Sequence, residues 1–377
     1  MILTPVTMIA SGVTLLSSLL TPSQNALYRR PRRRHVTETP TESPITVIVT
    51  SHGNARQLDE HLPLYLTQDY PAGYEVIVVG EKNDSETEDI LKRYSGHPIL
   101  YTTFIPETSR YMSHKKLAIT LGMKAARNEW VVITDPSCKP NTNHWLRNMS
   151  AYFTPSTHLV LGYTNYGLSA PDYYRFEHLY TAFYIFREAL HRKAYRTNCY
   201  NVAIRKSVFL EGNGFQGNLK YTISEYDYLV NKFSDRHTAL CLEKEGWMTE
   251  DTPSKKQWQN KHIYLKETVS HLRRTRRHFL RYRLDQYAMY ANYALIAGLA
   301  VYGVITHQWI ACAVATVSLA LTICLRTMIG KRALQAYDQP ISPWKIIPYE
   351  LSMVWRNTRN RIRYENADKY DFISHKV

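Results

Sequence analysis

The chain has 377 residues, of which 44% are apolar and 12% aromatic, with a formal net charge of +15. A chain of this length and composition buries a substantial core, which excludes a globally disordered protein. The excess positive charge comes without any recognisable nucleic-acid-binding motif, so we expect no nucleic-acid partner. The five cysteines include no CxxC pair and predict reduced thiols, not a disulfide framework.

The basic residues gather mostly beside apolar segments, where the positive-inside rule and anionic lipids favour them. This placement predicts a membrane partner. The clusters lie at residues 29–34, 273–283, 326–332 and 356–363.

Residues 1–20 carry no side-chain charge, are rich in Leu, Ile and Val, and are followed by the basic run YRRPRRR. A secretory signal peptide has its positive charge before the apolar stretch, so the order predicts an N-terminal anchor helix whose carboxyl side is cytoplasmic. The alternative is an interfacial or buried helix, because the segment barely spans about 30 Å of hydrocarbon. Residues 21–43 form a basic linker.

Residues 44–270 alternate strand and helix patterns, as a βαβ domain does. The strands are continuous apolar runs, which predict a mostly parallel central sheet covered on both faces. We expect strands at 45–50, 74–80 and 130–134, and helices at 58–68, 84–94 and 113–127.

Two uncharged apolar runs, 287–305 and 309–325, are joined by only three residues. They predict a transmembrane helical hairpin within 285–327, with both basic outer flanks on the cytoplasmic side. Two buried helices of a soluble bundle are the alternative. In the remaining segment, 328–377, residues 342–363 suit an amphipathic helix lying on the membrane surface.

Polar residues follow the carboxyl ends of the three predicted strands, where open parallel sheets bind ligands. Asp135 is the most informative of them, because a carboxylate leaving a buried strand is held rigidly enough to meet a cation and a diphosphate. A residue that only forms a turn is the alternative.

Two stretches of this region resemble family 2 glycosyltransferases with the GT-A fold. The runs ITVIVTSHGNARQLDEHLPLYLTQDYPAGYEVIVVGEKNDSETEDILKRY and SHKKLAITLGMKAARNEWVVITDPSCKP are similar to that family's nucleotide-binding half. NVAIRKSVFLEGNGF and SEYDYLVNK are similar to its acceptor half. The resemblance covers residues 44 to 265 and implies an α/β fold of the GT-A type, to which the chain adds transmembrane helices.

The resemblance assigns donor-binding roles to residues that follow the first two strands and begin a helix. It implies that Ser51 and His52 contact the nucleoside, that Glu81 reads uracil, and that Lys115 and Lys116 face the diphosphate. A solvated basic pair is the alternative for the two lysines.

The metal-binding motif of the family, DXD, is only half present. Asp135 matches its first carboxylate, whereas Ser137 occupies the second position. The resemblance implies a Mg²⁺ or Mn²⁺ cofactor bound by Asp135, with Ser137 on the donor side and phosphate oxygens completing the coordination.

The segment SEYDYLV resembles the acidic motif that supplies the catalytic base of inverting transferases. Asp227 is the first candidate and Glu225 the second, with Tyr226 standing between them. An exposed acid pair favoured by a helix dipole is the alternative.

Residues 255–265 resemble the acceptor-clamping Gln-x-x-Arg-Trp region of polysaccharide synthases, without its Arg-Trp pair. An ordinary amphipathic helix explains the segment equally well. The candidate acceptor-binding side chains are Trp258, Lys261, His262 and Tyr264.

These features together predict an inverting glycosyltransferase that moves a sugar from a nucleotide-sugar, preferably a UDP-sugar, to a glycan or lipid-linked acceptor. We expect it in cell-surface polysaccharide synthesis, in the inner (cytoplasmic) membrane with its catalytic domain facing the cytoplasm. Ser137 and Tyr226 motivate the alternative, a catalytically degenerate subunit that binds glycan or scaffolds an assembly. A membrane-surface adaptor without a sugar ligand is a third possibility.

Overall fold

The computed structural model describes residues 4–31, 38–106, 112–191 and 193–372. Parts of the predicted linker, of the basic run at 29–34 and of the C-terminal tail therefore lie outside the described residues. The chain divides into two compact units, and each is described by itself. The α/β unit comprises residues 31–171, 185–273 and 360–377, and the helical unit comprises residues 1–30, 172–184 and 274–359.

The α/β unit is built on a seven-stranded sheet in the order β3-β2-β1-β4-β8-β6-β9. Among its strands only β8 runs antiparallel to the others, which confirms the predicted mostly parallel sheet. The strands are β1 (Ile45–Thr50), β2 (Tyr74–Glu81), β3 (Leu100–Ile105), β4 (Trp130–Thr134), β6 (Leu159–Gly162), β8 (Val202–Arg205) and β9 (Ala239–Cys241).

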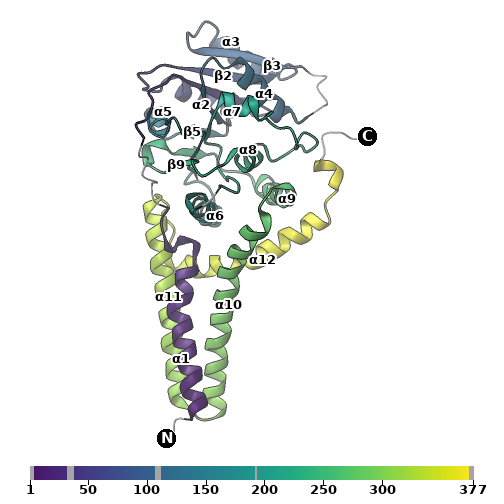
Figure 1. Ribbon diagram of the computed structural model, residues 1–377. Coiled ribbons are helices and arrows are strands. Elements are labelled where there is room, and N and C mark those ends of the chain that lie inside the picture. The colour runs from purple at the N-terminus through teal and green to yellow at the C-terminus, as the bar shows by residue number, and fades with distance from the viewer. Residues whose placement is uncertain (1–3, 32–37, 107–111, 192, 373–377) are drawn as a thin grey trace. The chain divides into compact units, whose positions relative to one another are not determined.

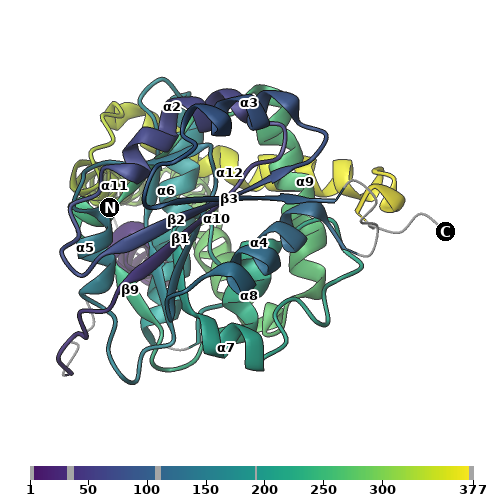
Figure 2. The same ribbon diagram turned by 90° about the horizontal axis from the view of Figure 1, so that it is seen from above.

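Helices cover both faces of this sheet. Figure 2 shows α2 (Ala55–Leu66) and α3 (Ser85–Arg93) on one side of β1 and β2, and α4 (His114–Ala125) on the other. All six residues of β1 are buried, as expected for a strand between two helical layers. On the α4 side the packing is close, because a Cβ atom added to Gly122 would lie 2.8 Å from a side-chain carbon of Ile48.

Strand register brings the carboxyl ends of β1, β2 and β4 nearly level. Thr50 of β1 pairs with Val79 of β2, and Val49 pairs with Thr134 of β4. The residues that follow these strands therefore emerge at one edge of the sheet. This edge is where ligands bind in open α/β folds.

A second, three-stranded sheet in the order β5-β10-β7 lies in the same unit. Its strands are β5 (Cys138–Pro140), β10 (Met248–Glu250) and β7 (Thr164–Tyr166). The pairing of β10 with β5 places Glu250 opposite Cys138, three residues after Asp135. The small sheet thus brings a second acid to the edge that carries Asp135.

The remaining elements of the α/β unit are mainly short helices. Helix α9 begins with a capping box between Ser254 and Gln257, which satisfies two of its terminal N–H groups. The helices are α5 (Trp145–Ser150), α7 (Lys206–Glu211), α8 (Glu225–Phe233), α9 (Lys255–His271), η3 (Lys244–Gly246) and η5 (Lys369–Phe372).

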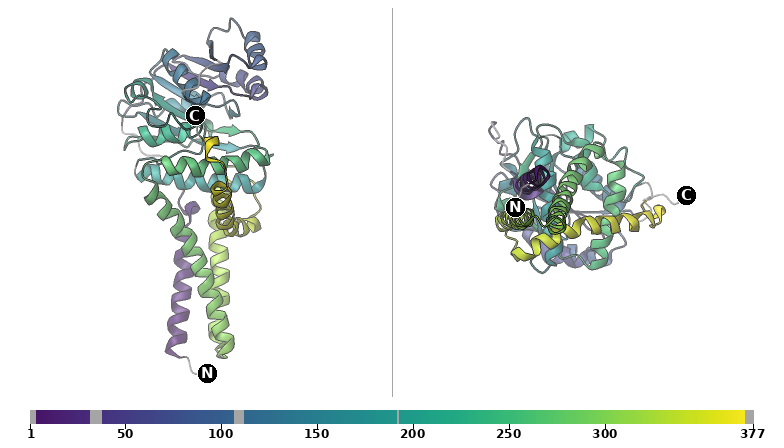
Figure 3. Two further views of the ribbon diagram at one scale, coloured as in Figure 1. Left: turned by 90° about the vertical axis from the view of Figure 1, so that its right-hand side faces the viewer. Right: turned by 90° about the horizontal axis from the view of Figure 1, so that it is seen from below.

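The helical unit contains three helices long and apolar enough to cross a membrane, at Pro5–Gln24, Tyr282–Ile305 and Trp309–Ala336. The predicted anchor and hairpin segments are among them. Figures 1 and 3 show α1 (Pro5–Leu20), α10 (Thr275–Ile305) and α11 (Trp309–Ala336) side by side. Helix α10 begins at Thr275, earlier than the predicted span and inside the basic segment. The Arg and Leu residues that precede the apolar run are themselves good helix formers.

The other elements of the helical unit are the short helices η1 (Thr21–Gln24), η2 (Ala26–Tyr28) and η4 (Pro343–Lys345), and the first parts of α6 (Asp172–His191) and α12 (Ile346–Glu365). Polar side chains join the three long helices internally. Ser18 of α1 donates to Asn292 of α10 at 3.1 Å, and Asn292 donates to Thr322 of α11 at 2.9 Å. Such hydrogen bonds hold apolar helices in one register where the hydrophobic effect between them is weak.

A buried ionic network also links this unit. Arg326 of α11 donates through Nε to Glu350 of α12 at 2.7 Å, and a terminal nitrogen lies 3.5 Å from Asp285 of α10. Glu350 accepts a further bond from Asn25, and Asp285 accepts one from Tyr180. Each buried carboxylate therefore has both a cation and a hydrogen-bond donor, which offsets the cost of removing the charges from water.

Candidate active site

Three consecutive residues at the start of α4 contact three acids that the sequence singled out. Ser113 caps the helix by accepting from the backbone N–H of Lys116 at 3.3 Å, which fixes the first turn. The acids come from the ends of β2 and β4 and from the first turn of α8. The pairs are Ser113 with Glu225, His114 with Glu81 and Lys115 with Asp135.

Asp135 is fully engaged by its neighbours. One carboxylate oxygen accepts from the ammonium of Lys115, and the other accepts from the Ser137 N–H at 2.9 Å and hydroxyl at 2.6 Å. Burial alone would raise the pKa of Asp135, but Lys115 and Ser137 outweigh it and bring the pKa below its usual value. Asp135 is therefore a carboxylate at neutral pH, and Ser137 supports its orientation.

Two tyrosine rings surround the Lys115 ammonium, at 4.9 Å for Tyr200 and 5.3 Å for Tyr226. Burial disfavours the charge on Lys115, yet Asp135 and the nearby tyrosines hold its pKa well above the usual value. The contact with Lys115 gives a role to Tyr226, the residue that stands between the two acids of the acidic motif. Tyr226 is buried beside Lys115, whereas the acids on either side of it make separate contacts.

A second lysine–carboxylate pair lies in this region. Lys261 of α9 is 3.2 Å from Glu250 of β10 and donates to the Tyr166 hydroxyl at 2.7 Å. Burial and Asp135 push the pKa of Glu250 upward against the opposing effect of Lys261. Glu250 was not among the residues predicted from the sequence, because the three-residue strand Met248–Glu250 is too short to give a recognisable strand pattern.

Asp227, the first candidate for the base, lies in a partly buried environment with a cation and a hydrogen-bond donor nearby. Its carboxylate accepts from the Thr197 N–H at 3.1 Å, and Arg196 lies 3.9 Å away. Burial raises the pKa of Asp227 to about 6, against the opposing effects of Arg196 and Thr197. A carboxylate with a pKa near the working pH is a stronger proton acceptor than an ordinary one. Glu225 accepts from Ser113 instead.

Lys116 occupies a different environment from Lys115. Its ammonium is buried and donates to the backbone carbonyls of Asn218, at 2.8 Å, and Tyr221. Burial lowers the pKa of Lys116 to about 8. The geometry favours a structural role, in which Lys116 fixes the loop before α8, and leaves Lys115 as the better candidate for donor contact.

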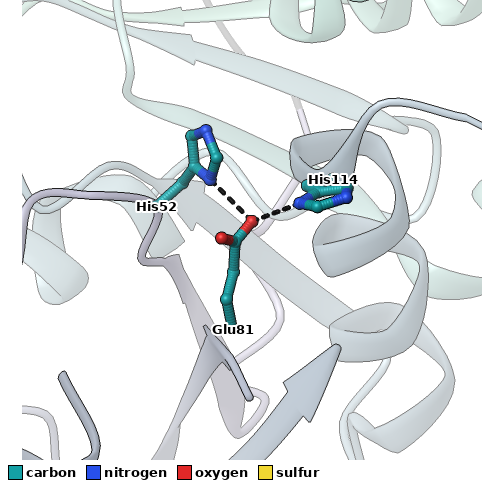
Figure 4. Close-up of side chains that lie close together, drawn as sticks. All are labelled: His52, Glu81 and His114. Atoms are coloured by element: carbon teal, nitrogen blue, oxygen red, sulfur yellow. Dashed lines mark hydrogen bonds and ion pairs between the residues drawn. The ribbon is translucent and has the colours of Figure 1, made fainter. Parts of the chain in front are cut away.

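The predicted nucleoside contacts lie close to one another. His52 Nδ1 and His114 Nδ1 lie 2.6 Å and 2.5 Å from the same oxygen of Glu81, as Figure 4 shows. Ser51 is buried and donates to Asn54 at 3.0 Å. His114 was not among the predicted site residues, because nothing in the sequence indicates that the start of α4 reaches Glu81.

The candidate acceptor residues fall on different faces of α9. Trp258 is buried against His262, with ring centroids 4.1 Å apart, whereas Tyr264 is 38% exposed and contacts Phe372. Lys261 is the member of this set that joins the charged cluster, through Glu250.

The oxygen atoms around Asp135 are chemically suited as ligands of a hard divalent cation. Asp135 and Glu250 are buried carboxylates that affect one another electrostatically, and oxygen ligands of this kind fit Mg²⁺ or Mn²⁺. One oxygen of Asp135 accepts two hydrogen bonds from Ser137 and the other accepts one from Lys115, so a cation would compete with these partners for the carboxylate.

Comparisons with known proteins agree with this fold. The model of the glycosyltransferase-like family 2 matches residues 42–275, which is more than half of the chain. The protein therefore belongs to the family 2 glycosyltransferases, and its α/β unit has the GT-A fold. No curated protein matches the chain.

Among solved structures, the mannosyltransferase PcManGT from Pyrobaculum calidifontis, in complex with GDP-Man and Mn²⁺, is similar with a TM-score of 0.54 and 18% identity. The match covers 90% of this chain and 98% of that one. S. aureus TarS matches with a TM-score of 0.45 and 14% identity over 84% of this chain and 92% of its own. TarS in complex with UDP-GlcNAc gives 0.43 and 12% over 78% and 92%.

Proposed function

We propose that the protein is an inverting glycosyltransferase that moves a sugar from a nucleoside diphosphate donor to a hydroxyl of a glycan or lipid-linked acceptor. The observation that carries this proposal is the start of α4, where consecutive residues contact Glu81, Asp135 and Glu225. The first turn of α4 thus contacts an acid proposed for the nucleoside, one proposed for the diphosphate and one proposed for the acceptor hydroxyl.

Asp227 is the proposed base. It takes the proton of the acceptor hydroxyl while the hydroxyl oxygen bonds to the anomeric carbon. The bond from that carbon to the diphosphate oxygen breaks on the opposite face, so the configuration inverts and the nucleoside diphosphate leaves. The pKa of about 6 keeps Asp227 ionised at neutral pH, as this step requires.

Charge develops on the leaving diphosphate, and partly buried cations near its proposed place stabilise it. Lys115 is the first of these, and Lys261 is the second, on the acceptor side. A Mg²⁺ or Mn²⁺ ion held by Asp135 would add Lewis-acid stabilisation of the phosphate oxygens when bound. Ser137 supports this ligand in place of a second carboxylate.

The remaining predicted residues complete the proposal. Ser51, His52 and Glu81 are the proposed nucleoside contacts, with a UDP-sugar as the preferred donor. The proposed acceptor lies beside α9 near Lys261, whose ion pair with Glu250 joins the charged cluster, whereas Trp258 and Tyr264 lie on other faces of that helix. The three candidate spans tether the enzyme to the inner membrane with its catalytic unit on the cytoplasmic side, where it serves cell-surface polysaccharide synthesis.

The test is a transfer assay on the full chain in detergent, using UDP- and GDP-sugars with Mn²⁺ and a panel of lipid-linked and oligosaccharide acceptors. We expect turnover with one donor class, loss of turnover in Asp227→Asn, and strong reduction after chelation. Asp59→Asn is the control, because Asp59 forms only an exposed ion pair with Arg93.

Nucleotide-sugar binding without turnover, under conditions in which Asp227→Asn binds equally well, would contradict catalysis. That result would favour the degenerate, glycan-binding subunit, which Ser137 and Tyr226 motivated from the sequence. Inversion is read from the anomeric configuration of the product, and a retained configuration would contradict the proposed single displacement.

A further inference from the structure

The cluster of His52, Glu81 and His114 has the composition of a transition-metal site. Each residue offers one ligand atom, and the three atoms lie within 4.8 Å of one another. Figure 4 shows both imidazole rings turned toward the same carboxylate oxygen. The rings approach it from different sides, with an interplanar angle of 81°. This arrangement leaves the rings unstacked and directs a nitrogen of each toward a common point.

Three separate elements hold these ligand atoms in place. His52 follows β1, and its backbone N–H donates to Asn54 at 2.9 Å. Glu81 ends β2 and pairs with Ile105 of β3, which fixes its backbone in the sheet. His114 is the first residue of α4, directly after the helix cap. The site is therefore prepared by the fold and needs little ordering to bind an ion.

The distances require only a small adjustment. Zn²⁺ bonds to imidazole nitrogen and carboxylate oxygen are about 2.0 to 2.2 Å, so tetrahedral ligand atoms stand about 3.3 Å apart. Both nitrogens now lie at hydrogen-bond distance from Glu81, at 2.6 Å and 2.5 Å. A side-chain rotation that moves the Glu81 oxygen about 1 Å away from both nitrogens would give the oxygen–nitrogen spacing that a tetrahedral ion needs.

The exposure of the residues leaves room for a further ligand. The His52 side chain is 64% exposed and that of His114 is 36% exposed, whereas Glu81 is 11% exposed. The carboxylate thus forms the inner side of the cluster and the rings form its outer sides. Water or a solute can reach the remaining coordination position.

We propose that His52, Glu81 and His114 bind a late first-row divalent cation, best fitted by Zn²⁺, at a site distinct from the Asp135 carboxylate. Imidazole nitrogen prefers such ions, whereas the oxygen ligands around Asp135 prefer Mg²⁺ or Mn²⁺. The inference does not require the proposed transferase reaction, but it uses His52 and Glu81, so the ion and the proposed nucleoside would compete for these two side chains. Its competitor is a metal-free cluster in which Glu81 accepts hydrogen bonds from both rings.

The test measures Zn²⁺ binding by the full chain in detergent, purified without a polyhistidine tag, in competition with a chromophoric chelator. The variants are His52→Ala and His114→Ala. The matched control is His144→Ala, because His144 also lies beside a carboxylate, 3.3 Å from Asp69, on another part of the α/β unit. Co²⁺ replaces Zn²⁺ in a parallel experiment, since its visible spectrum reports tetrahedral coordination.

We expect one Zn²⁺ site per chain that excess Mg²⁺ does not displace, and tetrahedral Co²⁺ bands. Each cluster variant should weaken Zn²⁺ binding at least about 100-fold, since loss of a direct ligand exceeds the 10- to 100-fold effect of a supporting one. The control should bind as the unmodified chain does. The proposal would be overturned if the cluster variants bound Zn²⁺ as tightly as the unmodified chain does. It would also be overturned if the unmodified chain gave no tetrahedral Co²⁺ bands. The Co²⁺ measurement on the unmodified chain does not depend on whether a variant folds.

Discussion

Lys115 and Asp135 stand 20 residues apart in the chain and form a partly buried ion pair between the first turn of α4 and the end of β4. The pair joins a helix on one face of the sheet to the strand end where ligands bind. Because Tyr200 and Tyr226 also pack against the ammonium, the pair lies in a partly buried environment, with 23% of the Lys115 side chain and 9% of the Asp135 side chain exposed. Electrostatic interactions are stronger there than in water.

Replacing Lys115 by Met should destabilise the α/β unit. The change leaves the Asp135 carboxylate buried without its cation, which typically costs about 3 kcal/mol or more. We expect a lower Tm in detergent and weaker nucleotide binding. Lys124→Met is the matched control, because Lys124 is an exposed lysine on the same helix. Equal Tm values for the two variants would show that the ion pair contributes no stability.

The same pair predicts a dependence of stability on pH. The pKa of Asp135 is lower in the folded chain than its ordinary value near about 4, because Lys115 and Ser137 outweigh burial. Its contribution is therefore complete above that ordinary value and is lost as pH falls through the lowered pKa. Thermal unfolding of the unmodified chain and of Lys115→Met should converge at acidic pH.

Asp227→Asn should abolish transfer while leaving donor binding nearly unchanged. Removal of a general base costs about 100- to 10,000-fold in rate. In the unmodified enzyme, kcat/KM should rise with pH through about 6 and then level off, because Asp227 must be ionised. The Glu225→Gln variant should keep this pH profile and lose less activity. A profile without an inflection near pH 6 would assign the base elsewhere.

Lys116→Met should affect stability more than donor binding. The buried amine satisfies the carbonyls of Asn218 and Tyr221, and each carbonyl left unpaired costs about 1 to 3 kcal/mol. We expect a lower Tm with a nucleotide Kd within a few-fold of the unmodified value. A Kd weakened as much as in Lys115→Met would restore Lys116 as a donor contact.

Arg326→Met should destabilise the helical unit, because it leaves Glu350 and Asp285 buried without their common cation. A cost of about 3 to 5 kcal/mol is typical of such a change. The double variant Arg326→Met/Glu350→Gln should recover part of the loss, because it removes one of the two buried charges that lack a cation. Thermal unfolding in detergent measures both, and a double variant less stable than the single one would contradict this account.

Much of the architecture was predictable because it follows from local patterns. Continuous apolar runs predicted β1, β2 and β4, and each observed strand lies within one residue of the predicted bounds. Uncharged stretches of sufficient length likewise predicted α1, α10 and α11 as candidate spans. The domain limits proposed from the sequence stay predictions.

The candidate site was predictable only where an acid or lysine stood directly beside such a pattern. Asp135, Glu81 and Lys115 follow strands or begin a helix, so their residue types pointed to binding. The sequence did not point to Glu250 or His114 as site residues. Their proximity to the site comes from strand pairing in the small sheet and from the packing of α4.

By itself, the sequence determined the α/β class, the apolar helices and the identities of several charged residues near strand ends, since periodicity and composition act over neighbouring residues. The tertiary structure decided which charges meet. Lys115 and Lys116 are adjacent on α4, and their side chains point in directions about 100° apart. The ammonium of Lys115 therefore reaches Asp135, whereas that of Lys116 reaches backbone carbonyls. Such a difference arises from the direction of side chains across packed elements, which spacing along the chain does not encode.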